Sequence, residues 1–254
     1  MRPLAPRKNE ALRHLKRIAD NRWRIDPVAD VSYDLLTNDL IYSARDIARL
    51  VKVHSEGTKT RTTSTAVQNL HDTYLKYAAE EDLQENVELM TEALTRCMWH
   101  FDQTFFFGLM RRHVRHAGSQ PAHNPKLAGG LARYELINLD VRDRMHRTLK
   151  AQWDPTIDHI IIWVRDADGN LRDFDELLGD MLHEMCHAWM DRFSDSMDER
   201  HERWVDLDDG HGEMFWNLLV FVLQRAHGWL GGAALLRMRD EARRDWTEAR
   251  AREV

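Results

Sequence analysis

The sequence has only two cysteines in 254 residues, Cys97 and Cys186. Two thiols exclude both a framework of several disulfides and a four-cysteine zinc ribbon. The longest uninterrupted apolar run, residues 218–223, is far too short to span a bilayer. Basic residues near the N-terminus are not followed by the apolar stretch that a secretory signal carries. These absences predict an intracellular protein, nuclear or cytoplasmic, with no membrane partner.

What the chain does have is enough apolar sequence for a sizeable core, together with abundant charge. Apolar residues make up 43% and charged residues 31% of the chain. This balance predicts one medium-sized domain with extensions. We expect an α+β protein with a helical N-terminal extension over 1–82, which contains a linker near 55–65. A central domain over 83–232 and a charged helical tail over 233–254 are predicted to follow.

Apolar spacing predicts helices through most of the first half of the chain. One helical stretch is predicted over 34–53 and a longer one over 66–115, with a break near 80–82. Strands are predicted over 131–139 and 159–164, and the second of these is rich in isoleucine. Both an edge position and a central position in a sheet are open for the second strand. The segment between the two strands shows no consistent pattern.

The main chemical signal is the motif His183-Glu184-x-x-His187. Apolar residues recur at helical spacing around it, so it is predicted to lie on a helix with a buried face. Residues four apart leave the same face of a helix, so the two imidazoles can bind one Zn²⁺. Glu184 then points toward the open side of the metal, where it can accept a proton from a bound water. Asp180 and Asp191 share this face and are candidates for orienting a ligand ring.

A catalytic zinc site needs a third protein ligand, because its fourth position is kept for water. His211 is the candidate, since Gly210 and Gly212 on either side of it permit close approach and an abrupt change of chain direction. An apolar helix is predicted directly afterwards, over 213–225. Glu213 is the alternative third ligand, and its use would make the protein a gluzincin-type peptidase.

These motifs resemble those of the SprT-like zinc metalloprotease domain family, which includes the DNA–protein crosslink protease Spartan. The segment HEMCHAW at 183–189 resembles the family's HExxHA helix, and GHGEMFW at 210–216 resembles its later motif. Looser similarities lie at 105–109 and 128–134, so the resemblance spans roughly residues 83–232. It implies a zincin-like fold in which a small β-sheet accompanies the HExxH helix, and in which the strand near that helix offers its edge to substrate.

The resemblance also implies a function, which is the hydrolysis of polypeptide substrates, including DNA-associated proteins. Zn²⁺ would be held by His183, His187 and His211, with Glu184 as the general base that activates the zinc-bound water. An alternative from another class is a non-catalytic module that keeps zinc as a structural clamp and binds partners. The presence of Glu184 argues against that alternative, because a structural site needs no general base.

Charge is distributed unevenly along the chain, whose formal net charge is −6. Residues 166–213 contain 16 acidic residues against four arginines and no lysine. Surfaces that contact phosphates are basic, so this count argues against DNA beside the metal and predicts a preference for basic polypeptides. The basic segments 1–24, 111–116 and 142–150 leave contact with DNA open elsewhere on the molecule.

Overall fold

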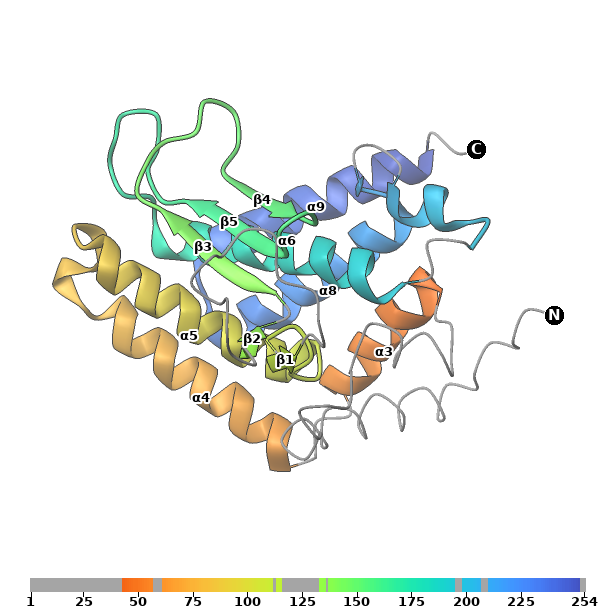
Figure 1. Ribbon diagram of the computed structural model, residues 1–254, viewed down its shortest axis with the longest axis horizontal. Helices are drawn as coiled ribbons and strands as arrows, with labels where there is room; N and C mark the ends of the chain where they lie inside the picture. The colour runs from red at the N-terminus through yellow and green to blue at the C-terminus, as the bar shows by residue number, and fades with distance from the viewer. Residues whose placement is uncertain are drawn as a thin grey trace.

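The protein is an α+β structure, mostly helical, with a three-stranded sheet and a separate two-stranded ribbon (Figure 1). The α+β class predicted from the sequence is therefore confirmed. None of the helices in the described part of the chain has the length and apolar character needed to cross a bilayer. The computed structural model describes residues 43–56, 61–111, 113–115, 133–135, 137–194, 198–206 and 210–251.

Helix α6, Phe174–Phe193, lies at the centre of the molecule and carries the HExxH motif (Figure 1). Asp175 and Glu176 lie in its first turn and Arg192 in its last, where each charge opposes the partial charge of the helix end. Strands β4 and β5 contact it. Four helices also pack against it: α3 (Ala44–Glu56), α5 (Val87–Phe105), α8 (Glu213–Leu230) and α9 (Ala233–Ala251).

The three-stranded sheet has the order β3-β5-β4. Strand β5, His159–Trp163, is parallel to β3, Asn138–Arg142, and antiparallel to β4, Ala151–Asp154. The strand predicted over 159–164 is thus confirmed, and it occupies the centre of the sheet rather than an edge. Its isoleucines are buried on both faces, as expected for a strand that is covered on both sides. The sheet edge that contacts α6 belongs to β4.

The long helix predicted over 66–115 is interrupted where expected but ends earlier than expected. Helix α4, Arg61–Ala78, is followed by a short 3₁₀ turn, Glu81–Gln84, and then by α5. The extension of α5 to residue 115 is wrong, because the backbone turns left-handed at Phe107 and Gly108, with φ of 62° and 68°. The carboxylate of Asp102 holds this turn by accepting two backbone N–H groups, those of Met110 at 3.1 Å and Arg111 at 3.0 Å.

Two other predicted boundaries need correction. The linker near 55–65 is shorter than predicted, because α3 continues to Glu56, where Arg225 of α8 donates to the carbonyl of Ser55 at 3.2 Å. Only 57–60 separate α3 from α4, and these lie outside the described residues. The single strand predicted over 131–139 is in fact two, which belong to different sheets. They are β2, Arg133–Glu135, paired with β1, His113–Arg115, and the start of β3.

One hydrophobic core runs across the predicted divisions at 82 and 232. Ile47 of α3, Leu70 of α4 and Leu235 of α9 are buried in the same cluster as the apolar face of α6. Helix α9 packs so closely on α6 that a side chain at Gly179 would stand 2.2 Å from the sulfur of Met238. The extension and the tail are therefore packed onto the helix that carries the motif, as far as residues 43–251 describe them. The basic segment 1–24 and residues 34–42 lie outside the described residues.

Candidate metal centre

Helix α6 presents His183 and His187 one turn apart on the same face. Their ring centroids lie 4.8 Å apart, and the two Nε2 atoms are 3.0 Å apart. Burial lowers the pKa of His183 to about 3 and that of His187 to about 2, and the neighbouring imidazoles contribute to both shifts. Both rings are thus neutral near pH 7, which is the form of imidazole that ligates a metal.

The loop before α8 delivers His211 to the same point. Its Nε2 lies 3.1 Å from Nε2 of His183 and 3.3 Å from Nε2 of His187. Gly210 has a φ of +90°, a conformation that other residues rarely adopt, and it packs against the ring of His187. Gly212 is required for a different reason: a Cβ there would stand 2.3 Å from the carbonyl carbon of Trp204.

The segment before the loop also fixes it. The backbone N–H of Gly212 donates to the carbonyl of Val205 at 3.1 Å. Val205 belongs to a short π-helical turn, Glu202–Asp206, whose Trp204 and Val205 are buried in the core. The turn Glu202–Asp206 therefore supports the loop that carries the third histidine.

The three Nε2 atoms form a nearly equilateral triangle, and the sides of this triangle match those of a zinc site. Nitrogens bound to one tetrahedral zinc at about 2.0–2.1 Å stand about 3.3–3.4 Å apart. Each neutral Nε2 carries either a proton or a lone pair, so three of them facing one another cannot all be satisfied by mutual hydrogen bonds. A cation that accepts three lone pairs satisfies all of them. Among the described residues, His183, His187 and His211 form the cluster with metal-ligating geometry.

Glu213, the alternative ligand, does not belong to this cluster. It lies in the first turn of α8, two residues after His211. The described geometry thus favours His211 over Glu213 as the third ligand.

Phe215 forms a floor beneath all three imidazoles. Its fully buried ring stacks on His187 with centroids 4.0 Å apart, and it meets His183 and His211 edge-on at 5.1 Å and 4.9 Å. Trp216 stacks on the outer side of His211 at 5.1 Å. The sequence pattern does not assign Phe215 a role, although its place in the first turn of α8, four residues after His211, brings it close to that ligand.

Glu184 is buried, with 8% of its surface exposed, and its carboxylate is bound by the edge strand. Oε2 accepts the backbone N–H of Trp153 in β4 at 2.7 Å. Burial raises the pKa of Glu184 to about 8; the Trp153 N–H acts in the opposite direction, and the charge of Asp180 adds to the increase. The role of Trp153 was missed by sequence reasoning, because 140–156 showed no strand pattern.

The two aspartates proposed to orient ligand rings are engaged elsewhere. Asp180 forms an ion pair with Arg172, and the side chains of both are largely buried. Asp191 accepts the indole N–H of Trp153 at 3.2 Å and lies 3.5 Å from Nε of Arg192. In the described part of the chain, these contacts link α6 to Arg172, just before the helix, and to Trp153 of β4. They do not involve a ligand imidazole.

Comparison with protein-family models, with curated proteins and with solved structures gives no match. Function is therefore inferred from the side chains of the site.

Proposed function

We propose that the protein is a zinc-dependent endopeptidase with a zincin-like, SprT-like active site. The observation that carries this proposal is the convergence of the Nε2 atoms of three neutral imidazoles, which lie 3.0–3.3 Å apart. Two of these imidazoles lie on α6, and the same helix carries the buried Glu184. The donor set fits Zn²⁺, because three histidines with one open position is an established catalytic arrangement for that ion. Bound there, the ion would lower the pKa of a water and polarise a peptide carbonyl.

The protein's own groups supply the remaining chemistry. Glu184 accepts a proton from the attacking water and later passes it to the leaving amine. The carboxyl holds this proton between the two steps. The N–H of Trp153 binds one carboxylate oxygen and fixes its direction. Phe215 keeps the three imidazole planes in place and contributes an apolar, water-excluding wall.

Strand β4 is the element that an extended substrate would follow. It is the edge of the three-stranded sheet that contacts α6, and it passes directly beside the general base through Trp153. A polypeptide that pairs with a free strand edge gains main-chain hydrogen bonds with little demand on its sequence. We therefore propose unstructured polypeptides as substrates. Proteins associated with DNA, which the family resemblance adds, stay a prediction.

The test compares the wild-type protein with Glu184→Gln, which removes the base and keeps the size and all three imidazoles. We expect equal zinc content by elemental analysis, while hydrolysis of an unstructured polypeptide falls by about 10²–10⁴-fold. Glu88→Gln, the same change at an exposed site on α5, serves as the matched control and should keep full activity.

Two results would overturn the proposal. If the wild-type protein binds zinc and hydrolyses no polypeptide, the non-catalytic zinc-stabilised module becomes the better account. If wild type and Glu184→Gln hydrolyse substrate equally, the activity comes from another protein in the preparation.

A further inference from the structure

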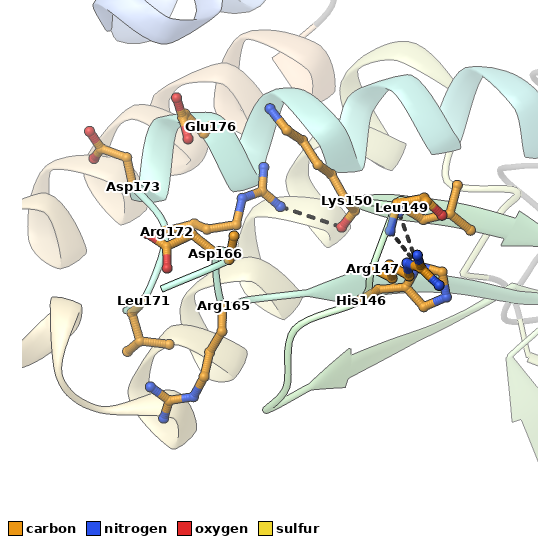
Figure 2. Close-up of a pocket in the computed structure, with 12 residues that line it drawn as sticks. His146, Arg147, Leu149, Lys150, Arg165, Asp166, Leu171, Arg172, Asp173 and Glu176 are labelled. Atoms are coloured by element: carbon orange, nitrogen blue, oxygen red, sulfur yellow. Dashed lines mark hydrogen bonds between the residues drawn. The ribbon is translucent and has the colours of Figure 1, made fainter. Parts of the chain in front are cut away.

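The described contacts attach strand β4 to α6 at three levels. Near the start of the strand, the guanidinium of Arg172 donates to the carbonyl of Lys150 at 3.4 Å, which Figure 2 shows as a dashed line, and the same side chain is paired with Asp180 of α6. In the middle, the backbone N–H of Trp153 binds Glu184. The third attachment lies at the far end of the strand and takes no part in the mechanism described above.

The carboxylates at these three levels lie on one face of α6. Asp180, Glu184 and Asp191 follow one another at intervals of four and seven residues, which return to nearly the same side of a helix. From Asp180 to Asp191 the helix rises about 16 Å, and an extended strand covers about the same distance between residues 150 and 155. The row of carboxylates and the strand therefore match in length, so each level of β4 has its own acidic residue on α6.

The attachment at the far end holds both the side chain of Trp153 and the backbone that follows it. The indole N–H donates to the carboxylate of Asp191 at 3.2 Å, and the guanidinium of Arg192 lies over the ring, 5.3 Å from its centroid. Arg192 also donates to the carbonyl of Pro155 and pairs with Asp158 at 2.6 Å. The last turn of α6 thus holds the end of β4 and the turn that leads to β5.

Trp153 is the residue through which Asp191 can act on the general base. Its backbone N–H reaches Glu184 at 2.7 Å while its indole reaches Asp191, so one residue is held at two points of the same helix. Only 9% of its surface is exposed. A single hydrogen bond would still let the strand rotate or slide along α6, and the second bond removes that freedom. The direction of the Glu184 carboxylate therefore depends on both bonds.

We propose that Asp191 is a positioning residue for the hydrolytic reaction. Through the indole of Trp153 it fixes β4 at the level where the backbone N–H of that residue meets Glu184. The inference rests on the proposed function and goes beyond it, because it assigns a role to a side chain two turns away from the general base. It also replaces the role of orienting a ligand imidazole, which the sequence suggested for Asp191.

The first measurement compares kcat and KM of zinc-loaded variants on an unstructured peptide, with kcat expressed per bound zinc. Asp191→Ala removes the acceptor, and we expect kcat to fall about three- to tenfold, the effect of losing one hydrogen bond, while KM changes by less than about twofold. Asp191→Asn keeps a carbonyl oxygen and should restore kcat to near the wild-type value. Because Asp191 is exposed, neither change leaves a cavity in the core.

The reciprocal variant and a control on the same helix identify the contact. Trp153→Phe removes the indole N–H and keeps an apolar ring. It should lower kcat, and adding Asp191→Ala to it should have no further effect, because both changes remove one bond. Asp175→Ala is the matched control, since it removes another carboxylate of α6, which accepts the hydroxyl of Tyr74 at 2.8 Å. It should lower the melting temperature and leave kcat per bound zinc unchanged.

The second measurement needs no turnover. In protein labelled with nitrogen-15 tryptophan, the backbone signal of Trp153 is identified by its absence in Trp153→Phe. We expect its amide hydrogen to exchange with solvent at least about tenfold faster in Asp191→Ala than in the wild type, and at the wild-type rate in Asp191→Asn. The amide of Trp189, which is buried within α6 and identified in the same way, is the reference and should not change.

The outcomes separate the two proposals. A wild-type kcat in Asp191→Ala, equal losses in the Ala and Asn variants, or losses that multiply in the double variant overturn the positioning role and leave the peptidase standing. Unchanged exchange of the Trp153 amide in Asp191→Ala overturns it as well. If zinc-loaded wild-type protein cleaves no peptide, the peptidase proposal has failed, and the exchange measurement still decides whether Asp191 holds the N–H of Trp153 on Glu184.

Discussion

Two kinds of histidine can be compared among the partly or fully buried ones in the described part of the chain, and they differ in what their nitrogens face. His100 of α5 has its Nε2 3.1 Å from the hydroxyl of Thr73. His201 has Nδ1 3.3 Å from the hydroxyl of Ser194 and Nε2 3.6 Å from the carboxylate of Asp206. These two are structural histidines, because a hydroxyl can donate or accept as the tautomer requires.

The histidines of α6 and of the 210–212 loop differ, since each of their Nε2 atoms faces two others of its own kind. His100 is partly buried like the three clustered histidines, and His201 is buried, so burial does not separate a ligand from a structural residue. What separates them is that Nε2 of His100 and both nitrogens of His201 face an oxygen, whereas the three Nε2 atoms of the other group face one another.

The largest effect should come from removing one member of the trio. His211→Ala leaves two nitrogens on α6, and we expect zinc affinity to fall by at least about 100-fold, as measured by competition with a chelator. His100→Gln alters a partly buried histidine of the other kind and should keep full zinc content. Glu213→Ala should also retain the metal. The reverse pattern for His211 and Glu213 would remove the SprT-like proposal and favour a gluzincin site.

A smaller effect is expected when the loop is moved and its ligand is retained. Gly212→Ala places a methyl group against the backbone of Trp204, so the loop must shift. We expect about tenfold weaker zinc binding and a loss of about 1–3 kcal/mol in the free energy of unfolding.

Gly228→Ala is the matched control, because a Cβ at that position of α8 meets nothing within 4 Å. It should stabilise the protein by about 0.5–1 kcal/mol, through the better helix propensity of alanine, and leave zinc binding unchanged. Equal zinc affinity in the two variants would show that Gly212 does not position His211.

The smallest effect concerns the pH dependence of a structural histidine. Burial first, and then the charge of Arg96, lower the pKa of His100 below its ordinary value of 6.5. The unfolded chain thus binds more protons than the folded one just below pH 6.5, so the contribution of His100 to stability is present above that pH and lost as the pH falls. The melting temperature of zinc-loaded wild-type protein should therefore drop more between pH 7.5 and 5.5 than that of His100→Gln. Parallel curves for the two proteins would contradict this expectation.

Local features of the sequence predicted the local features of the structure well. The HExxH helix and the isoleucine-rich strand depend on periodicity within one segment, and both elements are present. The loop position of His211 followed from its two glycines. By contrast, the end of α5 depends on Asp102 bonding to backbone eight and nine residues later, a contact that helical periodicity does not reveal.

Contacts between distant segments could not be predicted from one sequence. The four residues of β4 qualify as a strand because they pair with β5, and Trp153 gains its role from Glu184, which lies 31 residues away. The count of acidic residues over 166–213 was correct, but a count does not show which way the side chains point. The structure turns Asp175 toward Tyr74 of α4 and Glu176 toward Arg237 of α9.

The bond between the N–H of Gly212 and the carbonyl of Val205 has a consequence for the timing of metal exchange. A movement of the loop backbone that carries His211 away from the other two imidazoles would break this bond. The amide of Gly212 would then exchange its hydrogen with solvent in the same event that releases the ion. If zinc binds as proposed, the lifetime of the bound ion would depend on the opening rate of one turn, Glu202–Asp206, while the rest of the core stays folded.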